Sequence, residues 1–233
     1  MLYIVSTPIG NLGDITIRAI ETLKSVHVIA AEDTRHTRIL LNHYDIQTPL
    51  VSYYEHNQFR RGEELIRQLL DGKDIALVTD AGTPGISDPG YQLIRLAWQQ
   101  KVAVTAVPGA SALITALSLS SLPCHSFAFE GFLPVKSQSR RNKLASLRDE
   151  KRTVIFYESP HRLLKTLADI AAVLKDAEVV VARELTKKFE EIRRGTAAEL
   201  QDHFIKHPPK GEFVLLLNLS AGKFLPDVEP QEG

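Results

Sequence analysis

Short apolar runs alternate with amphipathic stretches through the first half of the chain. Runs of consecutive apolar residues predict strands at 2–6, 28–31, 50–54, 75–79 and 102–107. Apolar residues at helical spacing predict helices at 16–26, 34–44, 59–70, 91–100 and 110–121. Alternating strands and helices favour a parallel, doubly wound sheet, and uniformly apolar strands fit a sheet covered on both faces. The pattern therefore predicts an α/β domain over residues 1–121.

A second set of elements follows the turn Leu122-Pro123-Cys124, which we interpret as the domain boundary. The apolar pattern predicts strands at 126–130, 153–157, 179–183 and 213–217, and a strand pair within 189–195. It predicts helices at 137–148, 163–174 and 197–204. We therefore expect a second α/β domain over residues 125–222, followed by a frayed tail at 223–233.

The composition indicates the environment of the protein. Of the 233 residues, 44% are hydrophobic and 24% are charged, so a packed core is expected and disorder is not. The single cysteine, Cys124, cannot form an internal disulfide, which fits a reducing cytoplasm. We find no basic leader and no apolar run of about 18 residues, so we expect neither a signal peptide nor a membrane span.

The charge is neutral overall but unevenly distributed. Lysine and arginine total 28, as do aspartate and glutamate, which gives no general attraction to nucleic acid. Residues 134–152 nevertheless contain seven basic and only two acidic side chains, among them Arg140, Arg141 and Lys143. This segment can bind RNA phosphates, or it can be an ordinary solvated helix face, and the sequence leaves both interpretations open.

Three loops rich in glycine and proline follow predicted strands. They are residues 6–14, 79–90 and 107–112. Glycine permits positive φ and close backbone approach, whereas proline fixes φ, so such loops form rigid surfaces on which a ligand can lie. Ligands of open parallel sheets bind beyond the carboxyl ends of the strands. Any one loop can be an ordinary tight turn, but three on successive strand ends favour a ligand site.

The loops lack the motifs of the common phosphate-bearing cofactors. Neither G-x-G-x-x-G nor G-x-x-x-x-G-K-[ST] occurs in them, which argues against a dinucleotide and against an ATP phosphate cradle. A cationic cofactor without phosphates, such as S-adenosylmethionine, needs neither device. The missing motifs alone do not select it.

Seven segments of the chain carry a family resemblance. They are VSTPIGNLGDIT, AAEDTRHT, LVTDAGTPGISDPG, VPGASALITAL, FYESPHRL, RELTKKFEE and KGEFVLLL, in this order from Val5 to Leu217. With them the chain resembles the ribosomal RNA small subunit methyltransferase I family of the tetrapyrrole methylase superfamily. The resemblance implies two α/β domains with S-adenosylmethionine in the cleft between them. It further implies a homodimer that methylates a cytidine 2′-hydroxyl in the decoding region of small-subunit (16S) rRNA.

The resemblance also implies which residues hold the cofactor, largely through their backbone. In the first domain these are Pro8, Ile9, Ala81, Gly82, Thr83, Ile86, Ser111 and Ala112. In the second domain they are Tyr157, Leu185 and Gly211. Family members commonly extend into a small C-terminal helical region, whereas this sequence ends soon after KGEFVLLL. If that region helps to hold RNA, RNA affinity is affected here.

Transfer of a methyl group to a ribose hydroxyl benefits from a nearby proton acceptor. Our candidates for catalysis are Asp80, Glu32 and Asp33, with Asp88, His56, His161 and Glu184 as further possible bases. Asp33 can equally cap the helix that begins at Thr34, and Asp88 can cap the helix after Gly90. No candidate stands out as the general base, and we expect no metal.

Several cations and aromatic residues are candidates for RNA contact. Besides the basic segment, these are Arg35, His56, Arg162, Lys187 and Lys188, with a solvated surface role as the alternative for each. Tyr53, Tyr54 and Phe59 could stack a splayed base, although core packing is the expected role of at least one of them. Assembled 30S subunits are the expected substrate.

Two other functions compete with this interpretation. A methyltransferase of the same fold could act on a tetrapyrrole or on a modified protein histidine, and basic patches do not exclude a carboxylate-rich tetrapyrrole. Alternatively, an rRNA-binding or assembly protein could retain the fold without turnover, although the intact loops disfavour this.

Overall fold

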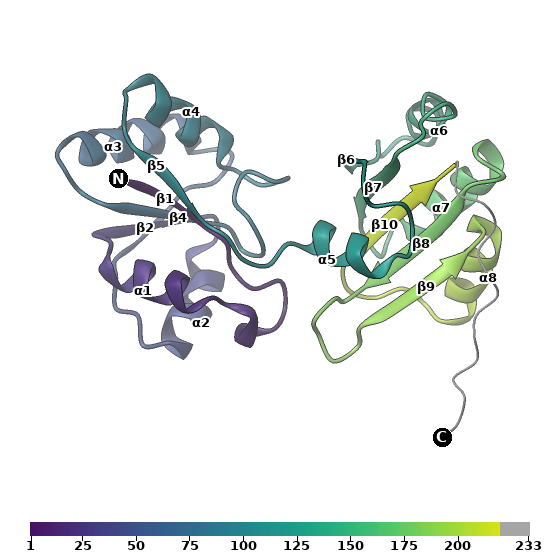
Figure 1. The fold of residues 1–233 in the computed structure, drawn as a ribbon, viewed down its shortest axis with the longest axis horizontal. Coiled ribbons are helices and arrows are strands. Elements are labelled where there is room, and N and C mark those ends of the chain that lie inside the picture. The colour runs from purple at the N-terminus through teal and green to yellow at the C-terminus, as the bar shows by residue number, and fades with distance from the viewer. Residues whose placement is uncertain (220–233) are drawn as a thin grey trace. The chain divides into compact units, whose positions relative to one another are not determined.

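The computed structural model describes residues 1–219 and divides the chain into two compact units (Figure 1). The first is Met1–Ala112, and the second begins at Leu113, within helix α5 (Ala112–Leu119). The boundary predicted at Leu122–Cys124 instead assigns this helix to the first domain. An apolar helix between two units does not reveal by its sequence which unit it joins. The predicted tail at 223–233 lies outside the described residues.

The first unit contains a five-stranded sheet in the order β3-β2-β4-β1-β5. Its strands are β1 (Leu2–Val5), β2 (Val28–Ala31), β3 (Leu50–Ser52), β4 (Ile75–Val78) and β5 (Val104–Val107). Every neighbouring pair is parallel, which confirms the predicted doubly wound sheet. Because all strands run the same way, their carboxyl ends lie at one edge of the sheet.

Helices cover both faces of this sheet. They are α1 (Ile17–Ser25), α2 (Thr34–His43), α3 (Gln58–Leu70) and α4 (Tyr91–Gln99). Leu23 of α1 and Leu41 of α2 share one apolar cluster with Val5, whereas α3 and α4 share another with Leu2 and Leu77. Successive strand residues point to opposite faces, so β1 supplies both clusters. Figure 1 shows the two helix pairs on opposite sides of the sheet.

The second unit contains a mixed sheet in the order β6-β7-β10-β8-β9. Its strands are β6 (Phe127–Phe132), β7 (Thr153–Glu158), β8 (Glu178–Arg183), β9 (Glu191–Gly195) and β10 (Phe213–Asn218). β6 and β7 are parallel, and β10 is antiparallel to both of its neighbours. Residues 189–195 were expected to hold a strand pair. This expectation is wrong, because they contribute the single strand β9, which pairs with β8.

Three further helices of this unit share one apolar cluster. They are α6 (Ser137–Ala145), α7 (Leu163–Val173) and α8 (Ala197–Lys206), and Leu144, Leu167 and Phe204 represent them in the cluster. The β10 strand lies at the centre of the sheet and is buried along its whole length, as its apolar run at 213–217 predicts. Over residues 1–219, no helix is long and apolar enough to cross a membrane.

Candidate functional site

Backbone hydrogen bonds join the first two glycine- and proline-rich loops at the carboxyl edge of the first sheet. The Thr7 amide donates to the Gly82 carbonyl over 2.9 Å, and the Gly82 amide donates to the Thr7 carbonyl over 3.1 Å. The Thr7 hydroxyl also donates to the Thr79 carbonyl over 3.1 Å. The loops that follow β1 and β4 are therefore fixed to one another, as rigid ligand-bearing loops require.

The third loop meets the other two around Gly82. Gly82 has φ +84°, and an added Cβ would lie 3.5 Å from Ile9 Cγ2 and 3.8 Å from the Ala110 carbonyl. The Ser6 and Thr83 hydroxyl oxygens lie 2.9 Å apart. A Cβ on Gly109 would lie only 3.0 Å from the Ser6 Cβ. The glycines were expected to allow close contact between loops, and such contacts occur at Gly82 and at Gly109.

The expected cofactor residues of the first unit differ in exposure. Pro8, Ile9 and Gly82 are buried, whereas Ala81 is exposed and Ile86 is 40% exposed. Thr83 lies between these extremes and is held by Ser6, and Ser111 and Ala112 are partly buried after β5. The buried residues shape the backbone surface, and the exposed ones are available to a ligand.

Carboxylates from two neighbouring strands lie beside these loops. The Thr79 hydroxyl donates to Glu32 Oε2 over 2.7 Å, and the Asp33 amide donates to Asp80 Oδ1 over 3.1 Å. Burial raises the pKa of Asp88 to about 6; the nearby charges of Glu32 and Asp80 add to this rise, and a hydrogen bond with Thr79 opposes it. The edge therefore carries negative charge, and Asp88 changes its protonation state about one pH unit below neutrality.

Asp33 is a helix cap. Its carboxylate accepts hydrogen bonds from the Arg35 amide over 2.8 Å and from Arg35 Nη2 over 2.6 Å. The side-chain hydrogen bond from Arg35 holds the pKa of Asp33 well below its usual range, so this carboxylate is a poor proton acceptor. The capping interpretation is thus confirmed at Asp33. At Asp88 it is wrong, because Gly90 is the N-cap of α4 and no side chain caps that helix.

The composition of the edge fits S-adenosylmethionine. Residues 6–14, 79–90 and 107–112 contain no lysine or arginine, so these loops offer no cation to a phosphate group. Their carboxylates and backbone carbonyls suit a ligand with a sulfonium and an ammonium group and without phosphates. The loops therefore offer acceptors that suit both cationic groups of this cofactor.

The second unit brings its expected cofactor residues to one edge of its own sheet. Tyr157 lies near the end of β7, Leu185 follows β8, and Gly211 precedes the antiparallel β10, which lies between those two strands. Gly211 has φ +88°, and an added Cβ would collide with the Glu184 carboxylate. The positive φ and the nearby Glu184 side chain therefore favour glycine at this position, independently of any ligand.

The structure corrects the expectation that Arg140 contacts RNA. This side chain is buried and forms an ion pair with the buried Asp169 over 2.6 Å. Its Nη1 also donates to the Val135 carbonyl over 3.0 Å. A guanidinium enclosed in this way has no surface to offer a phosphate. Asp169, which reasoning from the sequence missed, lies 29 residues away in the chain and carries no local signal.

The other candidate RNA contacts differ in their availability. Lys143 pairs with Glu130 over 2.7 Å, and Lys187 pairs with both Glu184 and Glu212 over 2.9 Å. Arg162 donates to the Leu133 carbonyl and pairs with the buried Glu158, and its side chain is only 21% exposed. The remaining candidates are exposed. They are Arg35 and Arg141, which pair with Asp33 and Asp169, and His56 and Lys188.

The aromatic candidates after β3 also differ in how far their side chains are exposed. Tyr53 is 1% exposed and packs in the core, which confirms the expectation that at least one of the three has this role and leaves Tyr53 unable to stack a base. Tyr54 is 40% exposed and Phe59 is 69% exposed. An apolar run that ends a strand does not show at which residue the chain leaves the core.

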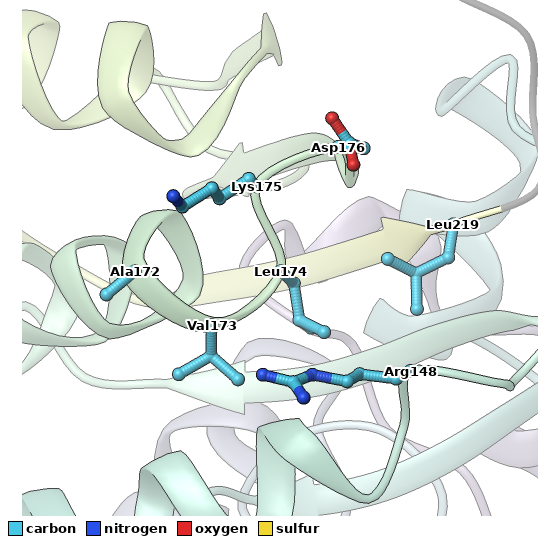
Figure 2. Close-up of a pocket in the computed structure, with 7 residues that line it drawn as sticks. All are labelled: Arg148, Ala172, Val173, Leu174, Lys175, Asp176 and Leu219. Atoms are coloured by element: carbon cyan, nitrogen blue, oxygen red, sulfur yellow. The ribbon is translucent and has the colours of Figure 1, made fainter.

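A separate hollow of roughly 380 Å³ lies at the opposite edge of the second sheet. Figure 2 shows its lining residues, which include Arg148, Lys175 and Leu219. Asp176, also in the lining, precedes β8, and Leu219 follows the antiparallel β10. Apart from Arg148, which belongs to the basic segment 134–152, none of the residues expected to bind the cofactor or RNA lines this hollow, so it is not the cofactor site indicated by the sequence.

Comparisons with known proteins agree with the loops. Residues 1–201 match the model of the Tetrapyrrole (Corrin/Porphyrin) Methylases. The chain is 52% identical over 231 residues to ribosomal RNA small subunit methyltransferase I from Halalkalibacterium halodurans, covering 99% of this chain and 78% of that protein. It is 50% identical over 217 residues to the protein of the same name from Thermotoga maritima, covering 93% and 97%.

Solved structures with the same fold are more distant in sequence. Uroporphyrin-III-C-methyltransferase from Thermus thermophilus has a TM-score of 0.65 at 18% identity and covers 94% of both chains. Diphthine synthase has a TM-score of 0.70 at 14% identity and covers 93% of this chain and 89% of its own. At such identities the likeness concerns the fold. The near-complete match at half identity shows more: the chain belongs to the tetrapyrrole methylase family and, within it, to the ribosomal RNA small subunit methyltransferase I family.

Proposed function

We propose that this protein transfers a methyl group from S-adenosylmethionine to the ribose 2′-hydroxyl of a cytidine in the decoding region of small-subunit rRNA. The observation that carries the proposal is the identity of about one half, over nearly the whole chain, to relatives named ribosomal RNA small subunit methyltransferase I. The joined loops and the absence of cations among them support the cofactor. A solved uroporphyrin-III C-methyltransferase with a TM-score of 0.63 is complexed with S-adenyl homocysteine, which supports it further.

The residues proposed to hold the cofactor have distinct tasks. Ala81 and Thr83 offer backbone groups on either side of Gly82, whose own amide and carbonyl are bonded to Thr7 and whose missing side chain allows close approach. Ile86 offers an exposed apolar surface. Pro8, Ile9, Ser111 and Ala112 complete the first-unit set, and Tyr157, Leu185 and Gly211 form the second-unit set. When bound, S-adenosylmethionine supplies a methyl group on a sulfonium, whose leaving group is a neutral thioether.

Because the leaving group needs no proton, the protein's main tasks are to align the ribose hydroxyl and to accept its proton. Glu32 and Asp80 are the proposed acceptors, since both carboxylates lie at the loop edge and are oriented by hydrogen bonds from Thr79 and from the Asp33 amide. Asp33 contributes by orienting Asp80 rather than as a base. Asp88 adjusts the local charge, because its protonation near neutrality changes the number of anions beside them.

The proposed substrate is the assembled 30S subunit, and the proposed active form is a cytoplasmic homodimer. Lys188 and Arg141 are the proposed phosphate contacts, because both are exposed, and Arg141 shares its guanidinium with Asp169. Overall neutrality leaves little non-specific attraction to RNA, so recognition depends on a shaped substrate.

A methyl-transfer assay tests the proposal against a second candidate, tetrapyrrole methylation, which the shared fold favours. The full chain is incubated with radiolabelled S-adenosylmethionine and with small subunits, naked rRNA or a uroporphyrinogen. We expect label on one cytidine ribose of the small subunits. Label on the tetrapyrrole alone would replace the proposal by the second candidate. Cofactor binding without transfer to any acceptor would indicate a binding protein instead.

A further inference from the structure

Three aromatic side chains share one face at the edge of the second sheet. The Phe129 and Tyr157 ring centroids lie 4.9 Å apart, and those of Phe132 and Tyr157 lie 5.9 Å apart, both in edge-to-face geometry. Phe132 ends β6 and is 54% exposed. One side of its ring is therefore supported by Tyr157, and much of the remainder is open.

A β-bulge places Phe132 on this face. Phe129 is opposite Ile155, so a regular register would put residue 131 opposite Tyr157. The register instead shifts between Phe129 and Phe132, and Phe132 becomes the partner of Tyr157. Gly131, with φ +64°, accommodates the extra residue. Without the bulge, Phe132 would point to the opposite face of the sheet.

The backbone after Phe132 is held by two arginines. Arg162 Nη2 donates to the carbonyls of Leu133 and Pro134, and Arg140 Nη1 donates to those of Pro134 and Val135. Both guanidiniums are fixed in turn, Arg162 by Glu158 and Arg140 by Asp169. An exposed ring on such a fixed segment loses little conformational entropy when a ligand binds.

The charge of the segment after Phe132 indicates which kind of ligand the ring binds. Residues 135–145 contain four cations, Lys136, Arg140, Arg141 and Lys143, and no acidic residue. Arg140 and Arg141 pair with Asp169 of α7 and Lys143 pairs with Glu130, whereas Lys136 is exposed. An exposed aromatic ring followed four residues later by an exposed lysine suits single-stranded nucleic acid, in which bases stack on rings and phosphates meet cations.

We propose that Phe132, backed by Tyr157 and Phe129, is a platform on which one unpaired nucleobase of the RNA substrate stacks. The inference rests on the proposed function and adds to it the residue that positions the RNA. Because Tyr157 is also a proposed cofactor residue, a base on this platform lies beside the cofactor edge of the second unit. Phe132 is thus a positioning residue, and it takes no part in the chemical step.

The test uses the full chain and a short single-stranded oligoribonucleotide that contains 2-aminopurine, whose fluorescence is quenched by stacking. We expect quenching by the unmodified protein, a loss of affinity of about tenfold or more in Phe132→Leu, and recovery in Phe132→Tyr. Phe127→Leu is the matched control, because Phe127 is a partly exposed phenylalanine on the same strand face, roughly 15 Å away along β6.

Two further measurements make the result specific. Calorimetry should give the same S-adenosylmethionine affinity for all variants, and Phe132→Leu should raise the KM for small subunits without a matching change in melting temperature. No quenching by the unmodified protein, or equal affinity losses in Phe132→Leu and Phe127→Leu, would overturn the platform. Failure of the proposed function would look different, since the unmodified protein would then leave small subunits unmethylated whatever its oligonucleotide affinity.

Discussion

Gly82 holds a backbone conformation that side chains disfavour, at the point where three loops meet. Its φ of +84° is strained for any residue with a Cβ, and an added Cβ would face Ile9 and the Ala110 carbonyl. We expect Gly82→Ala to cost about 1 kcal/mol of stability and to weaken S-adenosylmethionine binding strongly. Calorimetric titration of the folded variant measures this affinity.

Gly72 provides a matched control for that substitution. It has φ +85°, almost the same as Gly82, but no atom lies within 4 Å of its added Cβ, and it lies in the turn after α3, away from the loops. Gly72→Ala should show a similar loss of stability with unchanged cofactor affinity. If both variants bound the cofactor as the unmodified protein does, the second loop would have no close contact with it.

The raised pKa of Asp88 predicts a pH-dependent stability. The folded protein binds this proton more tightly than the unfolded chain, because the pKa rises from 3.8 to about 6 on folding. The first unit should therefore lose stability as the pH rises from about 4 to about 6. Asp88→Asn should remove this loss, on the order of 1 to 2 kcal/mol after allowance for partial exposure.

Thermal melts between pH 4 and pH 7 check this expectation. The stability difference between Asp88→Asn and the unmodified protein should grow in favour of the variant up to about pH 6 and then level off. Asp71→Asn, at an exposed position beyond α3, serves as the control. A constant difference across the whole range would show that Asp88 titrates alike in the folded and unfolded chains.

Among the elements, α6 depends on one buried carboxylate of α7. Burial alone would raise the pKa of Asp169, but hydrogen bonds from Arg141, Arg140 and Ser137 outweigh it and leave the pKa below its usual value. Asp169→Asn leaves the buried guanidinium of Arg140 without its counter-charge. We expect a loss of about 3–5 kcal/mol in urea unfolding.

A double variant separates charge from packing at this contact. Arg140→Met combined with Asp169→Leu removes both buried charges and should lose much less stability than Asp169→Asn alone. Glu150→Gln, which breaks the surface pair with Arg152, should change the midpoint little. Equal midpoints for Asp169→Asn and the unmodified protein would contradict a structural role for the pair.

The elements also show what the sequence could predict. The β1 and β4 strands were predicted to within one residue at either end, because strands buried on both faces are apolar throughout. β9 lies at the sheet edge and none of its residues is fully buried, so its pattern was ambiguous and a strand pair was wrongly expected. The β6 bulge was not predictable from the period of two, since an inserted residue breaks that period.

The loops and the charges of the candidate site were predictable to different extents. Glycine and proline are local signals, and they located the loops that the structure joins through Thr7 and Gly82. Ion pairs such as Arg140 with Asp169 depend on long-range contacts, which one sequence does not reveal. The basic segment 134–152 therefore contains both exposed cations and a buried arginine, Arg140, that stabilises the fold.

For the whole molecule, neutrality limits how RNA can be found. With 28 basic and 28 acidic side chains, the protein has little general affinity for a polyanion, and several candidate cations are already paired. We predict faster methylation of assembled small subunits than of naked rRNA, because an assembled subunit presents the reacting hydroxyl in a fixed orientation.

Initial rates at matched RNA concentration and salt, with mapping of the methylated ribose, compare the two substrates. The subunit should react well above the rate of the naked RNA, and the difference should persist at raised salt, where non-specific binding weakens. An equal or faster reaction on naked rRNA would point to recognition of local RNA sequence alone.

The strand order of the first unit also has a consequence for folding. β1 pairs with β4 and β5, and Leu2 lies opposite Ile75 and Val104, which are 73 and 102 positions further along the chain. Contacts this distant in sequence slow folding, because the entropy of closing the intervening chain must be overcome first. The loops after these strands meet only when this sheet closes. We therefore expect S-adenosylmethionine binding to appear late in refolding and in a single step. A fragment that ends before β5 should not bind the cofactor.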